Sequence, residues 1–117
     1  MNNVKNQVTL IGNLGSDFDF KIVGDDKKMS KASLATNQYY KNREGELIKE
    51  TQWHNLIAWG KLAENMNQIA KKGDQIIVQG KITYRNYEDD EGKKHYVTEI
   101  VVNEFLKLGK SSGTPAE

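Results

Sequence analysis

Both tryptophans of the chain lie in the stretch TQWHNLIAWGKLAE, residues 51–64. If the first part of this stretch is a β-strand, alternate side chains point to opposite faces. One face then carries two large rings with polar and aliphatic neighbours: Trp53, Asn55, Ile57 and Trp59. The other face carries His54, Leu56 and Ala58. Only one of these apolar faces can line an ordinary core, so the rings of the other face need a different reason to be there.

A second stretch, QIIVQGKITYRNY at residues 75–87, shows the same doubling. One of its faces is mainly aliphatic and carries Ile76, Val78, Gly80, Ile82 and Tyr84. The other face includes Lys81, Thr83, Arg85 and Tyr87. Rings interleaved with cations fit a single-stranded nucleic acid, because bases of any sequence stack on rings while Lys and Arg follow the phosphates. A hydrophobic core or a subunit interface is the competing interpretation of the same tryptophans.

Length and composition limit the class of protein. The chain has 117 residues, enough for one domain, and a formal net charge of +1, so an argument for a polyanionic partner must come from local patches. There is no cysteine, which excludes disulfides and thiolate metal sites. The N-terminal residues lack the apolar run of a signal peptide, and no stretch approaches membrane-spanning length. We therefore expect a cytoplasmic location and no membrane partner.

Periodicity predicts the elements that position these residues. Strand patterns cover 4–14, 18–23, 33–40, 47–59, 75–87 and 95–108. A helical pattern within 61–74 places Leu62, Met66, Ile69 and Ala70 on one face, with Lys71 and Lys72 at its C-terminal end. Three long strands, one helix and two long strands predict an all-β fold, a five-stranded OB-fold barrel with one α-helix between strands 3 and 4, in preference to a sandwich. Residues 1–108 form this domain, and 109–117 read as a flexible tail.

Five segments in this order resemble the bacterial single-stranded DNA-binding proteins over nearly all of residues 3–108. They are VTLIGNLGSD, SLAT followed by Tyr39 and Tyr40, TQWHNLIAWGKLAE, KKGDQIIVQGKI and YVTEIVVNE. The resemblance implies sequence-independent binding of single-stranded DNA in replication, recombination and repair, with a cytoplasmic, nucleoid-associated location. It implies a homotetramer built as a dimer of dimers. Replication and repair proteins are expected as partners only if a longer acidic C-terminal tail exists.

The resemblance also assigns residues. Stacking positions correspond to Tyr40, Trp53, Trp59 and Tyr87, and of the adjacent pair 39 and 40 only Tyr40 is assigned to the DNA face. Cations of the DNA-lining positions are Arg43, Lys61, Lys72 and Arg85, to which strand alternation adds Lys81. Asn55 and Asn86 stand where relatives often have cations, which predicts a shallower salt dependence. Phe18 replaces a usual proline, with an effect expected on local strand geometry only.

Other candidate residues receive structural interpretations. His54 points away from the tryptophans and has no partner for a metal or catalytic site, because the other histidine, His95, is placed in a loop; a core or interface position is therefore expected. The resemblance to the family implies that this position is a subunit contact. The acidic run 88–91 reads as a solvated hairpin tip, so no metal and no cofactor is predicted. Lys27, Lys28 and Lys31 read as solubility charges in and after a turn.

Three alternative functions are weighed against DNA binding. A primosome-type or RNA-binding OB module is the alternative within binding. A small hydrolase lacks a visible pair of acid and base, so no catalytic residue is assigned and no enzyme is predicted. An interaction module stays open, because exposed rings also form protein interfaces.

Overall fold

The computed structural model describes residues 5–109. In this part of the chain the elements are β1 (Val8–Leu14), β2 (Asp19–Val23), β3 (Lys27–Lys41), β4 (Leu47–Trp59), α1 (Gly60–Ile69), β5 (Gln75–Glu88) and β6 (Lys94–Gly109). Five strands pair in the order β1-β5-β6-β4-β3, and β3 pairs back onto β1 to close a barrel. Within residues 5–109, β2 pairs only with β3, and α1 lies between the third and fourth barrel strands. The predicted OB-fold barrel is confirmed.

The barrel closes where β1 meets β3. Asn13 lies opposite Ala35 and Leu14 lies opposite Leu34. A Cβ atom at Gly12 would lie 2.2 Å from the carbonyl oxygen of Ala35, closer than any real side chain permits. The chain can therefore close here only because glycine lets the two backbones approach.

The core fills the barrel and the space beneath the helix. Its buried members are Leu14, Phe18, Leu34, Leu56, Ala58, Ala63, Met66, Ala70, Ile76, Val78, Ile100 and Val102. Phe18 is one of them. The presence of Phe18 in place of the usual proline therefore affects core packing, and not only the local strand geometry as the sequence predicted.

The predicted buried face of the helix is partly wrong. Met66 and Ala70 are buried as expected, but Ile69 is 48% exposed and Ala63 takes its place against the barrel. The Ser30 hydroxyl donates a hydrogen bond to the Ala63 carbonyl at 2.9 Å, which fixes this side of α1 on β3. The contact with Ser30 of β3 thus sets the rotation of the helix about its axis.

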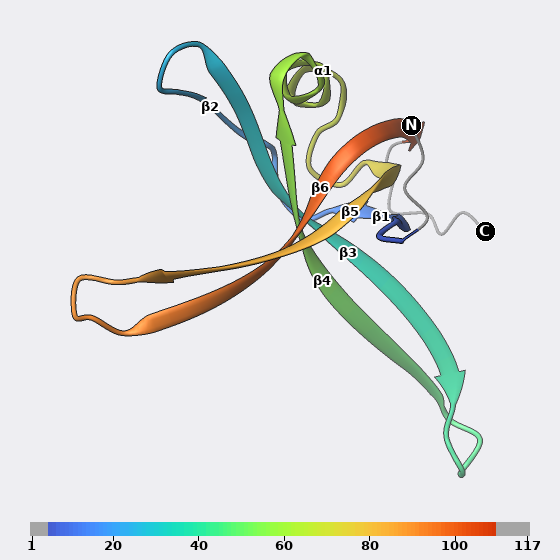
Figure 1. Ribbon diagram of the computed structural model, residues 1–117. Coiled ribbons are helices and arrows are strands. Elements are labelled where there is room, and N and C mark those ends of the chain that lie inside the picture. The colour runs from blue at the N-terminus through green and yellow to red at the C-terminus, as the bar shows by residue number, and fades with distance from the viewer. Residues whose placement is uncertain (1–4, 110–117) are drawn as a thin grey trace.

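Long hairpins extend away from the barrel (Figure 1). The β3–β4 hairpin turns at residues 42–46 and the β5–β6 hairpin turns at residues 89–93. Tyr84, predicted on the core face, is 76% exposed because β5 has already left the barrel beyond Ile82. Strand alternation continues into these hairpins, but neither face is then covered.

Several predicted boundaries shift. β3 begins at Lys27 rather than at residue 33, so Lys28 and Lys31 belong to a strand paired with β2. α1 ends at Ile69, so Lys71 and Lys72 follow the helix instead of forming its last turn. Most of the predicted tail, residues 110–117, lies outside the described residues. From residue 5 to residue 109, no helix is long and apolar enough to cross a membrane.

Candidate nucleic-acid interface

The outward face of the barrel wall runs in register across β3, β4, β6 and β5. One row of paired residues consists of Lys31, Ile57, Val101 and Lys81. The next row consists of Ser33, Asn55, Glu99 and Thr83. The two outward faces that the sequence predicted, on residues 47–59 and 75–87, therefore belong to one surface, with β6 between them.

Neither tryptophan lies in the core. Trp53 is 62% exposed and Trp59 is 44% exposed. A Cβ atom at Gly15 would lie 2.5 Å from Cζ3 of Trp53, so the indole rests on bare backbone just after β1. This support fixes the ring while most of its surface stays open to a ligand. Trp59 lies opposite Met29 at the end of β4, directly before α1.

The two tyrosines of the β3–β4 hairpin lie on opposite faces. Tyr39 is paired with Lys49, and counting along β4 in steps of two from Lys49 leads to Trp53. Tyr40 is paired with Ile48 and shares the alternation set of His54. Both rings are exposed, at 60% and 51%. Alternation thus places Tyr39, rather than the assigned Tyr40, on the face of Trp53, and a nucleic acid that contacts both Trp53 and Tyr40 must pass around the hairpin.

Tyr87 is held by a neighbour that the sequence did not reveal. Its ring stacks on His95 with centroids 5.1 Å apart and an interplanar angle of 19°. His95 lies on β6 rather than in a loop, and its Nε2 is 2.8 Å from an Asp89 carboxylate oxygen. The bond from His95, followed by the Lys93 N–H, lowers the pKa of Asp89. Asp89 also accepts the N–H groups of Glu91 and Lys93 at 2.9 Å, so this carboxylate of the acidic run shapes the hairpin turn.

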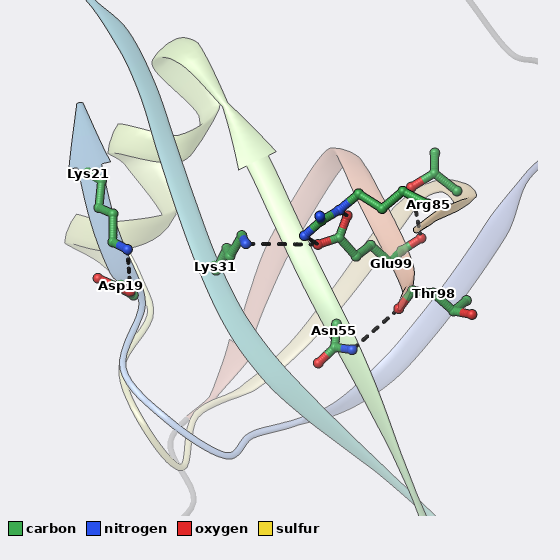
Figure 2. A network of polar contacts seen from close by, with 8 residues as sticks. Asp19, Lys21, Lys31, Asn55, Arg85, Thr98 and Glu99 are labelled. Carbon is green, nitrogen blue, oxygen red and sulfur yellow. Dashed lines mark hydrogen bonds and ion pairs between the residues drawn. The ribbon is translucent and has the colours of Figure 1, made fainter. Parts of the chain in front are cut away.

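Arg85, a predicted phosphate ligand, is already paired (Figure 2). Its Nε and Nη2 donate to the two carboxylate oxygens of Glu99 at 3.0 and 3.1 Å. Lys31 Nζ lies 4.0 Å from the same carboxylate. The Arg85 hydrogen bonds lower the pKa of Glu99, and Glu99 in turn raises the pKa of Arg85. Asn55 Nδ2 donates to the Thr98 carbonyl at 3.3 Å nearby.

These residues line a hollow of about 330 Å³ on the outward face. Its lining is Ser16, Lys31, Ala32, Ser33, Asn55, Leu56, Arg85, Val97 and Glu99. Sequence reasoning missed Glu99 and treated Lys31 as a solubility charge. Alternation in YVTEIVV is enough to place Glu99 on one side of its strand. The contacts of Glu99 with β3 and β5 could be predicted only from the order of the strands in the sheet.

The remaining predicted cations differ in their partners. Lys61 Nζ lies 3.2 Å from a carboxylate oxygen of Glu64, three residues further along α1. Across residues 5–109, the side chains of Arg43, Lys72 and Lys81 form no ion pair. Arg43 lies in the β3–β4 turn, Lys72 follows α1, and Lys81 lies in the register row of Ile57. The charged groups of these three side chains are therefore not engaged by a carboxylate in the described part of the chain.

His54 lies away from the tryptophan face. It is half-buried on β4, opposite Leu34, and its Nε2 is 2.9 Å from the Thr36 hydroxyl oxygen. This contact ties β3 to β4 at the base of their hairpin. Its role at a subunit contact stays a prediction.

Comparisons with known proteins agree with this geometry. The model of the "Single-strand binding protein family" matches residues 5–108. The chain is 39% identical over 110 residues to "Single-stranded DNA-binding protein 1" of Chlorobaculum tepidum, covering 92% of this chain and 68% of the relative. It is 41% identical over 106 residues to the protein of that name from Xylella fastidiosa, covering 90% and 78%.

A solved structure with a similar fold was obtained together with DNA. The structure "Plasmodium falciparum SSB complex with ssDNA" matches with a TM-score of 0.80 and 28% identity, over 88% of this chain and 94% of that one. Fold, sequence and the exposed rings therefore agree, and the chain belongs to the single-strand binding protein family.

Proposed function

We propose that this chain binds single-stranded DNA without reading its sequence. The observation that carries the proposal is Trp53, which is 62% exposed on a wall that also carries Lys31, Lys81 and Arg85. An exposed indole is a stacking surface for any base, and the cations attract the phosphates. Membership of the family supports the same function and a binding protein rather than an enzyme.

The assigned residues divide into two roles. Tyr40, Trp53, Trp59 and Tyr87 stack on bases, and Arg43, Lys61, Lys72, Lys81 and Arg85 contact phosphates. Stacking contributes about 1–3 kcal/mol per base, so a few rings suffice for tight binding. Each phosphate contact adds about 0.7 to the slope of log affinity against log salt.

A fluorescence titration tests the function. Oligo-dT added to the wild-type protein should quench tryptophan emission, because bases that stack on Trp53 and Trp59 are in direct contact with the fluorophores. Duplex DNA of the same length should quench little, since its bases are already stacked. Matched RNA serves as a competitor, and equal or stronger competition by RNA would favour an RNA-binding OB module instead.

The cellular role follows from binding without sequence preference. A protein that covers exposed strands protects them during replication, recombination and repair, in the cytoplasm where the nucleoid DNA lies. Residues 1–108 act as the binding domain. Contacts with replication and repair proteins would require an acidic C-terminal tail beyond residue 117.

We also propose that the chain assembles as a homotetramer, a dimer of dimers. Apolar side chains remain exposed on the outer surface of β1 and β6, with Ile11 at 52% and Leu106 at 67%. A hollow of about 400 Å³ adjoins them, lined by Thr9, Leu62, Ile77, Gln79, Asn103, Glu104, Phe105 and Leu106. Exposed apolar side chains beside a hollow of this kind are typical of a surface that associates with a second copy of the chain.

His54 provides a test of assembly. Replacing the half-buried imidazole by a longer cation, His54→Lys, removes its contact with Thr36 and places a charge at the proposed subunit contact. We expect a smaller particle mass by light scattering at low micromolar concentration. An unchanged mass would count against this contact, and His95→Lys, on the other long hairpin, is the matched control.

A further inference from the structure

One carboxylate lies within an otherwise cationic part of the binding wall. The Glu99 side chain is only 8% exposed, whereas the side chains of its partners Arg85 and Lys31 are 47% and 41% exposed. The two cations are therefore accessible to solvent, whereas the carboxylate that they share is almost entirely covered. A buried carboxylate at this depth needs its partners, because an unpaired buried charge is strongly unfavourable.

The pairing leaves part of the guanidinium available. Arg85 uses Nε and Nη2 toward Glu99, which are two of its five N–H donors. The two N–H groups of Nη1 and the second N–H of Nη2 remain for another acceptor. Arg85, Lys31 and Glu99, called here the Glu99 cluster, carry a net charge of +1 where two cations alone would carry +2.

We propose that Glu99 is the built-in counterion of the DNA-binding wall, a positioning residue that holds Arg85 and Lys31 and competes with a backbone phosphate for them. The inference rests on the proposed binding of single-stranded DNA. It goes beyond that function because it assigns an acidic residue the role of limiting affinity and salt dependence at this site.

The physical argument is one of competing anions. A strand phosphate and the Glu99 carboxylate seek the same donors, and a bidentate carboxylate is a strong competitor. While Glu99 is present, the cluster presents one net charge and releases fewer DNA counterions than two free cations would. Affinity and the slope of log affinity against log salt should therefore both follow the net charge of the cluster.

The wild type and three variants form a series in which this charge changes by one unit at a time. The wild type has +1, Glu99→Gln has +2, Lys31→Gln has 0, and the Glu99→Gln, Lys31→Gln double variant returns to +1. Oligo-dT affinity is measured for each at several salt concentrations. Glu99→Gln should steepen the slope by about 0.7, so its gain over wild type grows about fivefold for each tenfold decrease in salt.

The other two variants complete the series. Lys31→Gln should flatten the slope by a similar amount, and the double variant should return close to the wild-type slope. Asp25→Asn is the matched control. It changes the total charge by the same amount, but at the exposed turn of the β2–β3 hairpin, outside the hollow. Its slope should equal that of the wild type.

The outcomes separate this inference from the proposed function. If the wild type does not bind oligo-dT, the proposed function fails. If the wild type binds but Glu99→Gln binds equally or more weakly with an unchanged slope, or steepens it no more than Asp25→Asn, the counterion role is overturned. Should Glu99→Gln fail to fold in a thermal scan, Lys31→Gln still tests the counterion role, because the Lys31 side chain is half-exposed. An unchanged slope in Lys31→Gln would contradict the proposal.

Discussion

The β3–β4 and β5–β6 hairpins both carry aromatic residues away from the barrel, yet they hold them differently. In the β5–β6 hairpin, Tyr87 is stacked on His95 and Arg85 is paired with Glu99. In the β3–β4 hairpin, Tyr39 and Tyr40 point to opposite faces and both are exposed. Tyr87 and Arg85 of one hairpin are thus held by neighbouring side chains, whereas both tyrosine rings of the other hairpin are exposed.

The difference implies two modes of contributing to affinity. A side chain already held in place loses little conformational freedom on binding, but Arg85 must share its donors with Glu99. In the proposed mode of binding, an exposed ring such as Tyr40 stacks on a base without such competition and loses rotamer freedom as it does so. We expect the contribution of the β5–β6 hairpin to affinity to depend on salt and pH. The contribution of the β3–β4 hairpin should depend on the area of its rings.

The largest expected effect is at the base of the β3–β4 hairpin. Trp53→Ala should weaken oligo-dT binding by about 1–3 kcal/mol, because the indole is large, exposed and supported by Gly15. Tyr87→Ala should cost less, since its ring is smaller and His95 already stacks on it. Anisotropy of a labelled oligonucleotide measures both. A larger loss for Tyr87→Ala would reverse our ranking of the two hairpins.

A smaller effect distinguishes the two faces of the β3–β4 hairpin. Tyr40→Ala should weaken binding by about 1 kcal/mol, at the low end for one stacked base, whereas Tyr40→Phe keeps the ring and should bind as the wild type does. Tyr39→Ala should change little. The opposite result, a loss with Tyr39→Ala alone, would mean that the DNA stays on the face of Trp53 and does not pass around the hairpin.

The smallest expected effect concerns stability in acid. Arg85 lowers the folded-state pKa of Glu99 below its usual 4.5, so the pair stabilises the fold fully above that pH and loses this contribution as the pH falls through the folded pKa. Glu99→Gln should reduce the unfolding free energy at pH 7 by on the order of 1 kcal/mol, since Arg85 is half-exposed. It should also make the acid-induced loss smaller.

Urea unfolding between pH 3 and pH 7 measures this effect. Glu50→Gln, at an exposed site on β4 in the other hairpin, is the control and should leave the pH profile unchanged. An identical pH profile for Glu99→Gln and the wild type would show that the β5–β6 hairpin is not distinguished by its ion pair.

Much of the fold was predictable because the apolar residues of the strands follow a period of two, although Ile57, on the outward face of β4, is buried as well. Leu56 and Ala58 are buried while Trp53 and Trp59 are exposed, as a period of two requires once one face is the core. The helix could be located from the change in the period of apolar residues along the sequence. The predicted rotation of the helix about its axis was wrong, because Ile69 is exposed. That rotation depends on which residues of β3 lie beneath α1, and local periodicity carries no information about them.

The prediction that Tyr84 lies on the core face was wrong for a related reason. Alternation correctly gives the side of β5 on which it lies, but only the length of the barrel decides where that side stops being covered. The candidate site divides in the same way. Its rings and cations follow from residue type and strand parity, whereas their neighbours across the sheet do not.

The sequence by itself determined the barrel strands, the helix between the third and fourth of them and the outward side of Trp53 and Trp59, because these depend on periods and residue types that act locally. The tertiary structure decided that β6 lies between β4 and β5, which brings Glu99 between Arg85 and Lys31. It also decided that Tyr39, rather than Tyr40, shares the face of Trp53. These features arise from register and sheet order, which set long-range contacts that no single stretch of sequence specifies.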